Sequence, residues 1–266
     1  MTEIDCPLCR DSGLPPGNVY SADRDRVEFC ACWPDRISQW AVPKANIYPL
    51  YFGATFKNYD VNEKFKNQHE VLERCIAYAD AWTEVKRTGY CLSILGREPG
   101  SGKSHLASAI CNHLIKTHWR TSVRDQDVCL FVNVGAWFAA WRNLYMRFPG
   151  ENAERYADPL FRAEQEKLAS LESRMLTTEL LVLDDLSKFD VSDDQKKLPG
   201  LYNVVEHRAS HCLPIVVTEN ADSWEDASAN LGPKYGPVIT DRLIRSGATV
   251  IVESSTPAKK RSAKKS

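Results

Sequence analysis

The sequence contains no run of about twenty apolar residues, so it has no segment that would span a membrane as a helix. It also has no excess of basic residues. The 34 Lys and Arg stand against 35 Asp and Glu, which excludes a protein that binds nucleic acid through its overall charge. The amino terminus lacks the basic and then apolar layout of a signal peptide. We therefore expect a cytoplasmic protein, in which only a local patch would contact nucleic acid.

The sequence also lacks the cysteine pattern of a disulfide-bonded protein. The total of nine is odd, and five cysteines stand singly in apolar or helical surroundings. We expect these five to be small core residues in a reducing compartment: Cys75, Cys91, Cys111, Cys129 and Cys212.

The other four cysteines form two close pairs within residues 1–40. Turn residues separate the pairs, and the segment is too short to bury a core of its own. Four thiolates on one Zn²⁺ would supply the missing stability. The second pair is Cys-x-Cys, tighter than the usual Cys-x-x-Cys, and the alternative is a loose tail with incidental cysteines. The crowding favours zinc, with these ligands: Cys6, Cys9, Cys30 and Cys32.

A glycine-rich turn lies between an apolar run at residues 90–95 and a helical pattern at residues 103–118. Glycine allows several backbone N–H groups to face phosphate oxygens, and the helix dipole adds to the attraction. Lys103 would reach the β- and γ-phosphates of ATP, and the Ser104 hydroxyl would ligate Mg²⁺. The pattern predicts a P-loop formed by Pro99, Gly100, Ser101, Gly102, Lys103 and Ser104.

This turn departs from the usual P-loop pattern by one residue. Five residues instead of four separate Gly96 from Gly102, and we interpret the extra residue as slack where the strand ends. The alternative is an ordinary glycine-rich turn. The preceding strand, the following helix and an acidic partner downstream favour the P-loop.

That acidic partner is the pair Asp184 and Asp185, which ends the apolar run at residues 180–183. A strand beside the P-loop strand would place Asp184 next to Mg²⁺ and Asp185 where it can deprotonate the attacking water. Apolar strands also end in Asp-rich turns without any catalytic role. Together with the P-loop, the pair predicts an enzyme that hydrolyses ATP.

Short apolar runs alternate with helical patterns from residue 90 onward. This alternation predicts an α/β fold with a five-stranded parallel sheet, its strands near residues 90–95, 128–132, 180–184, 213–218 and 248–253. Helices are expected at 63–88, 103–118, 151–175 and 194–209, the last interrupted at residues 199–200. Asn220 follows the fourth strand, where an amide would hold a water against the γ-phosphate.

We expect four segments: a zinc-binding unit (1–40), an extended linker (41–62), the ATPase domain (63–254) and a disordered basic tail (255–266). The simplest role for the basic tail is to keep the protein soluble, and the alternative is a weak contact with nucleic acid. Aromatic residues of the linker would pack on the next domain or flank an adenine ring, packing being the commoner role.

The order of these elements resembles the DnaC/DnaI helicase loaders, AAA+ ATPases related to the transposition helper IstB. The resemblance covers nearly the whole chain. It is carried by Pro-Gly-Ser-Gly-Lys-Ser-His-Leu-Ala (99–107), Leu-Val-Leu-Asp-Asp-Leu (181–186) and Tyr-Phe-Gly-Ala-Thr-Phe-Lys-Asn-Tyr (51–59). The cysteine-containing front looks like the zinc-binding front of such loaders, which IstB-like helpers generally lack.

The resemblance implies roles for individual residues. It adds His105 to the nucleotide site and makes Asn220 the first sensor. Arg242, in Thr-Asp-Arg-Leu, stands where the family keeps an arginine finger, with Arg245 and Arg208 as substitutes. Ser187 replaces a common Gly, and the motif that carries a second sensor is missing.

The function that the resemblance implies is ATP-dependent loading of a DnaB-type replicative helicase onto single-stranded DNA. The zinc front would bind the helicase, and the ATPase domains would assemble into a ring or spiral. The alternatives are an IstB-like helper ATPase for a DNA transposase and an adaptor that binds nucleotide without hydrolysing it. The zinc front favours the loader over the helper, and the intact acid pair argues against the adaptor.

Overall fold

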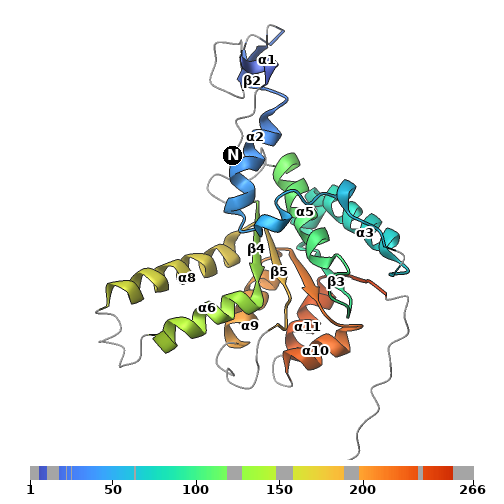
Figure 1. The fold of residues 1–266 in the computed structure, drawn as a ribbon, viewed down its shortest axis with the longest axis vertical. Coiled ribbons are helices and arrows are strands. Elements are labelled where there is room, and N and C mark those ends of the chain that lie inside the picture. The colour runs from blue at the N-terminus through green and yellow to red at the C-terminus, as the bar shows by residue number, and fades with distance from the viewer. Residues whose placement is uncertain are drawn as a thin grey trace, which may run out of the picture.

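The computed structural model describes residues 6–10, 18–21, 23–24, 26–62, 64–118, 128–147, 158–188, 198–232 and 236–253. A five-stranded sheet forms its centre (Figure 1). The basic tail expected at residues 255–266 lies outside the described residues.

All paired strands of this sheet run parallel, in the order β4-β5-β6-β3-β7. The strands are β3 (Cys91–Leu95), β4 (Cys129–Asn133), β5 (Leu180–Asp184), β6 (Ile215–Glu219) and β7 (Gly247–Ile251). The predicted fold class is confirmed. One detail of the prediction is wrong: β5, which carries the acid pair, is not the direct neighbour of the P-loop strand β3, because β6 lies between them.

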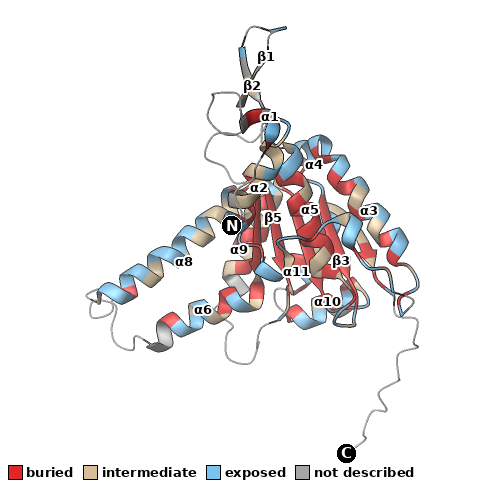
Figure 2. Cartoon of the chain, turned by 45° about the horizontal axis from the view of Figure 1, so that its top comes forward, coloured by how far each residue is buried: buried red, intermediate tan, exposed pale blue. Residues whose placement is uncertain are grey.

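Helices cover both faces of the sheet. One face carries α3 (Gln68–Asp80), α4 (Trp82–Thr88) and α5 (Lys103–His118). The other face carries α6 (Val134–Arg147), α8 (Pro159–Thr177), α9 (Leu198–Ser210), α10 (Trp224–Leu231) and α11 (Gly236–Arg245). Figure 2 shows buried residues concentrated in the strands, whereas α6 and α8 project beyond the sheet and α8 is largely exposed.

Two apolar cores result, because successive side chains of a strand point to opposite faces. In β3, Leu92 and Ile94 belong to the core under α3 and α5, whereas Cys91 and Leu95 belong to the core under α9 and α11. Both faces of the inner strands are therefore buried, which explains their continuous apolar sequences.

The amino-terminal unit stands apart from the sheet at one end of the molecule (Figure 1). It contains α1 (Pro7–Arg10) and an antiparallel pair, β1 (Asn18–Ser21) and β2 (Arg26–Phe29). Helix α2 (Trp33–Lys44) joins it to the rest of the chain and packs against α5.

The segment after residue 40 differs from the expected extended linker. Helix α2 continues to Lys44, and the short 3-10 helices η1 (Pro49–Tyr51) and η2 (Phe56–Asn58) follow. Pro43 lies inside the last turn of α2, where its missing N–H removes one helix hydrogen bond, and the helix ends one residue later. Apolar side chains of this segment join the sheet core, so it is packed and not free: Val42, Ala45, Ile47 and Tyr59.

Two helix predictions also change in detail. The single helix expected at 63–88 is two helices, α3 and α4, which meet at Ala81. The helix expected at 194–209 begins at Leu198, so Pro199 and Gly200 stand in its first turn and do not interrupt it.

Candidate functional site

The glycine-rich turn has the backbone that a phosphate cradle requires. Gly100 and Gly102 have φ angles of 78° and 86°, in the region that residues with a Cβ rarely adopt. The Lys103 ammonium is buried beneath the turn and donates to Gly96 O at 2.7 Å, Glu98 O at 3.1 Å and Ser101 Oγ at 2.9 Å. Burial lowers the pKa of Lys103, and nearby carboxylates oppose that shift.

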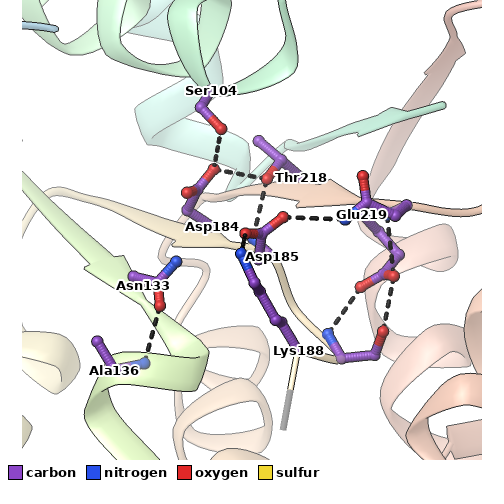
Figure 3. A network of polar contacts seen from close by, with 10 residues as sticks. Ser104, Asn133, Ala136, Asp184, Asp185, Lys188, Thr218 and Glu219 are labelled. Carbon is purple, nitrogen blue, oxygen red and sulfur yellow. Dashed lines mark hydrogen bonds and ion pairs between the residues drawn. The ribbon is translucent and has the colours of Figure 1, made fainter. Parts of the chain in front are cut away.

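The P-loop helix and the acid strand meet through Ser104, whose Oγ donates to Asp184 Oδ1 at 2.7 Å (Figure 3). Asp184 is 3% exposed at the end of β5, and Thr218 Oγ1 on β6 donates to the same carboxylate oxygen at 2.7 Å. Burial raises the pKa of Asp184, while the hydrogen bonds from Thr218 and Ser104 lower it. A buried carboxylate beside a hydroxyl is an oxygen-ligand set suited to Mg²⁺.

Asp185 directs its carboxylate to a different set of partners. Its φ is 54°, and its backbone N–H donates to Thr218 Oγ1 at 3.0 Å, so Thr218 holds both acids. Asn220 Nδ2 donates to Asp185 Oδ1 at 3.1 Å, and Lys188 Nζ lies 3.0 Å from Asp185 Oδ2. The structure thus brings the two predicted residues, Asp185 and Asn220, into contact.

Glu219, at the end of β6, fixes the turn after the acid pair. It is 2% exposed and accepts hydrogen bonds from Ser187 N at 2.7 Å, Ser187 Oγ at 2.6 Å and Asn220 N at 2.9 Å. Burial raises its pKa. The serine that replaces a common glycine therefore contributes its hydroxyl to this network.

Three residues of the network are absent from the sequence-based site: Thr218, Glu219 and Lys188. The signal for the first two was present, since they directly precede Asn220 at the end of a predicted strand. Parallel strands end at one edge of the sheet, so polar residues at the end of β6 face those at the end of β5.

Of the other predicted site residues, His105 lies beside the P-loop, whereas Arg242 and Arg245 lie on α11. His105 Nε2 lies 3.1 Å from Thr55 O, at the start of α5. Arg242 on α11 pairs with Glu206 on α9, with Nε 2.7 Å and Nη2 3.1 Å from the two carboxylate oxygens. Arg245 pairs with Asp241 at 2.8 Å. The assignment of Arg242 as an arginine finger stays a prediction.

Arg208 cannot substitute for that finger. Its side chain is fully buried and donates to four backbone carbonyls at 2.8–3.1 Å, those of Met175, Thr178, Glu179 and Pro214. Burial lowers its pKa to about 10. This guanidinium ties α8 to the beginnings of β5 and β6, and the prediction of a substitute role is wrong.

The four amino-terminal cysteines converge in the small unit. Their Sγ atoms all lie within 4.8 Å of one another, with Cys6 to Cys30 and Cys9 to Cys32 both at 3.7 Å. A Zn²⁺ ion with four thiolates at about 2.3 Å holds the sulfurs roughly 3.8 Å apart, so the cluster fits zinc. None of the nine cysteines forms a disulfide, as the sequence predicts, and Cys75, Cys91, Cys111 and Cys129 are buried. The prediction that Cys212 is a core residue is wrong, because its side chain is exposed.

Arg36 forms a second layer around this cluster. Its Nε donates to Cys32 Sγ at 3.2 Å and its Nη2 to Cys9 Sγ at 3.7 Å. Four thiolates exceed the charge of one divalent cation, and a guanidinium in this place offsets the excess. Cys32 is also the N-cap residue of α2, so the cluster is built directly onto that helix.

Proteins named replicative helicase loader DnaC match this chain in sequence. The Escherichia coli K12 protein is 25% identical over 201 residues, which is 75% of this chain and 66% of the relative. The protein of Buchnera aphidicola from Acyrthosiphon pisum is 35% identical over 106 residues, 40% of each chain. The predicted resemblance to DnaC-type helicase loaders is confirmed. The matched parts span 29% to 66% of the length of these curated relatives.

Solved structures of loaders share the fold. A crystal structure of the DnaC helicase loader has a TM-score of 0.54 at 18% identity, and covers 77% of this chain and 100% of the loader chain. The DnaI crystal structure has a TM-score of 0.52 at 18% identity, and covers 75% and 90%. The fold is that of an AAA+ P-loop NTPase. No protein-family model matches the chain.

The length and the apolar character of a helix decide whether it could cross a membrane. Among the described residues, none of the helices combines the length and the apolar character that crossing a membrane requires.

Proposed function

We propose that the chain binds Mg²⁺ and ATP and hydrolyses the γ-phosphate. The observation that carries this proposal is the hydrogen bond between Ser104 and Asp184, which joins the P-loop to the acid pair at 2.7 Å. The P-loop N–H groups and Lys103 hold the phosphates. Ser104 and Asp184 would hold Mg²⁺, which would supply positive charge to offset that of the phosphate oxygens.

Asp185 and Asn220 act on the attacking water in this proposal. The Asp185 carboxylate accepts a proton from the water, and the Asn220 amide, 3.1 Å from Asp185 Oδ1, orients it. Each carboxylate oxygen of Asp185 accepts one hydrogen bond, Oδ1 from Asn220 and Oδ2 from Lys188, and the remaining lone pairs would accept from the attacking water.

One substitution separates binding from hydrolysis. Asp185→Asn removes the proton acceptor but leaves the P-loop, Ser104 and Asp184 in place, so ATP should bind as before and hydrolysis should stop. Lys103→Ala is the matched variant, in which the loss of the ammonium should abolish ATP binding. Equilibrium binding and phosphate release measure the two effects. Hydrolysis by the Asp185 variant at the unsubstituted rate would reject the acid.

We further propose that this ATPase loads a DnaB-type replicative helicase onto single-stranded DNA. The similarity to proteins named helicase loaders supports this, together with the cysteine cluster at the front. The zinc-binding unit at 1–40 would bind the helicase and the ATPase domain at 63–254 the DNA, with the segment 41–62 between them. Self-association into a ring or spiral would let Arg242 reach the nucleotide of a neighbouring subunit.

A capture experiment tests the loader proposal. The immobilised full chain, with ATP and Mg²⁺, should retain a DnaB-type helicase and should not retain a transposase of the kind served by IstB-like helpers. A chain with Cys6→Ser and Cys30→Ser is the control, and it should lose the helicase while it still binds ATP. Capture of the transposase alone would reject the loader in favour of a transposition helper.

A further inference from the structure

The carbonyl of Ser101, at the turn of the P-loop, is held from behind by two side chains of a distant segment. Tyr59 Oη donates to Ser101 O at 3.1 Å, and Gln68 Nε2 donates to the same oxygen at 3.2 Å. Tyr59 is 8% exposed and Gln68 is 2% exposed, so neither hydrogen bond competes with bulk water. We propose that Tyr59 and Gln68 are positioning residues that orient the Ser101–Gly102 peptide for phosphate binding.

Because the peptide is planar and trans, fixing the Ser101 carbonyl also fixes the direction of the Gly102 N–H. In such a peptide the C=O of Ser101 and the N–H of Gly102 point to opposite sides. Two donors hold the oxygen on the side of Tyr59 and Gln68. The Gly102 N–H is therefore aimed away from them, toward the side where a P-loop receives phosphate.

The Tyr59 ring also supports the loop from the same side. A Cβ built on Gly102 would lie 2.4 Å from Tyr59 Cε2, and Gly102 has a φ of 86°. The ring and the loop backbone are thus in direct contact, and only glycine satisfies both the conformation and the space. This contact gives the Gly102 peptide little room to rotate.

The segment that carries Gln68 is itself anchored, and its neighbour Asn67 forms hydrogen bonds with the end of the sheet. Gln68 Oε1 accepts a hydrogen bond from Asn62 N at 2.5 Å, which fixes the amide group of Gln68. Next to it, Asn67 donates to Ile251 O at 2.6 Å and accepts from Glu253 N at 2.9 Å. Residues 59–68 therefore connect strand β7 to the P-loop. The sequence predicted packing or adenine contact for the linker aromatics, which include Tyr59, and no role for Gln68.

This inference rests on the proposed binding of nucleotide, and it predicts a particular pattern of affinities. Tyr59→Phe and Gln68→Leu each remove one donor and leave the other, so each should weaken ADP binding by about threefold to tenfold. The double variant leaves the carbonyl with no donor and should lose more than the product of the single losses. Tripolyphosphate should show the same factors as ADP, since the peptide contacts phosphate and not the base.

Calorimetric titration of the full-length chain with ADP and with tripolyphosphate measures these factors, and the Tm of each variant is recorded beside them. Tyr78→Phe is the matched control, because it removes a buried hydroxyl that donates to Tyr90 O at 2.9 Å, away from the loop. It should leave both affinities unchanged.

The single variants retain one donor on the carbonyl, so they keep the experiment decisive if the double variant fails to fold. Unchanged affinities in folded Tyr59→Phe and Gln68→Leu chains would overturn the inference. So would losses equal to that of Tyr78→Phe, which would indicate a general effect of buried hydroxyl groups. An unsubstituted chain that binds neither ligand would overturn the proposed function and this inference with it.

Discussion

The amino-terminal unit and the sheet domain hold their structures by different means. In the unit, the buried apolar residues that cluster are the cysteines Cys6, Cys9 and Cys30, with Val19 and Cys32 beside them. In the sheet domain, two clusters of aliphatic and aromatic side chains fill both faces of five strands. A small segment cannot bury enough apolar surface to offset its conformational entropy, whereas the larger domain can. The difference shows that the cysteines stand where a core would otherwise be.

Helix α2 belongs to both regions. Its N-cap residue, Cys32, is a member of the cysteine cluster, and near its end Val42 is part of the sheet core. Lys116 on α5 lies 3.0 Å from Asp35 in the first turn of α2, so the two regions meet along the helix. Disruption of one region should therefore reach the other only through α2.

Zinc removal should produce the largest difference in stability between the amino-terminal unit and the sheet domain. Chelation should unfold the β1–β2 unit completely, because binding of the metal supplies its folding free energy. The sheet domain should keep its cooperative thermal transition, since its cores contain none of the four cysteine ligands. Elemental analysis should find one Zn²⁺ per chain before chelation, and circular dichroism should follow the unfolding.

The control for chelation is the chain with Cys212→Ser, a change at an exposed cysteine outside the cluster. It should retain zinc and the folded unit. Absence of zinc from protein purified without chelator would contradict the prediction.

The second prediction concerns a substitution that destabilises the sheet domain. Phe131 on β4 is fully buried, and Phe131→Ala should lower the free energy of unfolding of the sheet domain by about 3–5 kcal/mol through lost contacts and a cavity. Zinc affinity should not change, because the cysteine cluster does not contact this residue. Urea unfolding and chelator competition measure the two quantities, and a weakened zinc site would show that the regions are coupled.

The sequence of the sheet domain specified its strands well, because the strands are short and mostly apolar, and β5 is an uninterrupted apolar run, Leu180–Leu183, that ends in an acid. It did not specify strand order. Periodicity reports which residues are buried and gives no information on which strand lies beside which, so β6 was not expected between β3 and β5. The continuation of α2 past Pro43 was missed for a related reason, since tertiary packing of Val42 outweighs local helix-breaking signals.

In the candidate site, the residues that touch phosphate, metal or water in the proposal were predicted from the sequence, and those that hold them in place were not. Lys103, Asp184 and Asp185 stand in motifs whose spacing carries the chemistry. Thr218 and Tyr59 act through hydrogen bonds across 34 and 42 positions of sequence. The position of Thr218 at the end of a predicted strand was a signal for its place in the site, whereas no local pattern indicates that Tyr59 contacts Ser101.

The third prediction concerns Asp184 and the stability that the sheet domain loses by burying its charged carboxylate. The folded chain binds the Asp184 proton more tightly than the unfolded chain, since the folded pKa is raised by burial. Stability is therefore lost as pH rises through the folded pKa. Asp184→Asn should raise the Tm at pH 7–8 in buffer without Mg²⁺, because the amide oxygen still accepts from Ser104 and Thr218 and carries no charge.

The gain in Tm should narrow as pH falls through the folded pKa of Asp184, which lies above 3.8. Asp185→Asn is the matched control: Asp185 forms an ion pair with Lys188, so its substitution should give no gain. A Tm difference that is independent of pH would contradict a penalty from buried charge.

The smallest effect on stability is expected at Arg242. Its pair with Glu206 is partly exposed, with side-chain exposures of 40% and 31%, so Arg242→Ala should change the free energy of unfolding by less than about 1 kcal/mol. Its effect on ATP hydrolysis should be large if it serves a neighbouring subunit, because arginine fingers contribute roughly 10³–10⁵ in rate. Thermal unfolding and ATPase rates of one variant therefore distinguish a surface ion pair from a finger.

A mixing experiment decides whether Arg242 acts on its own subunit or on the next. Arg242→Ala and Lys103→Ala chains should each be inactive alone. When they are combined, a Lys103→Ala subunit supplies the arginine and an Arg242→Ala subunit supplies the intact P-loop, so activity should partly return. Arg245→Ala tests the remaining substitute: Arg245 pairs with Asp241 on its own helix, so its loss should leave activity intact if Arg242 is the finger, and inactivity would move that role to Arg245. Mixtures that assemble together and stay inactive at every ratio would reject a finger acting between subunits, and would leave the pair with Glu206 as a contact of the stable region alone.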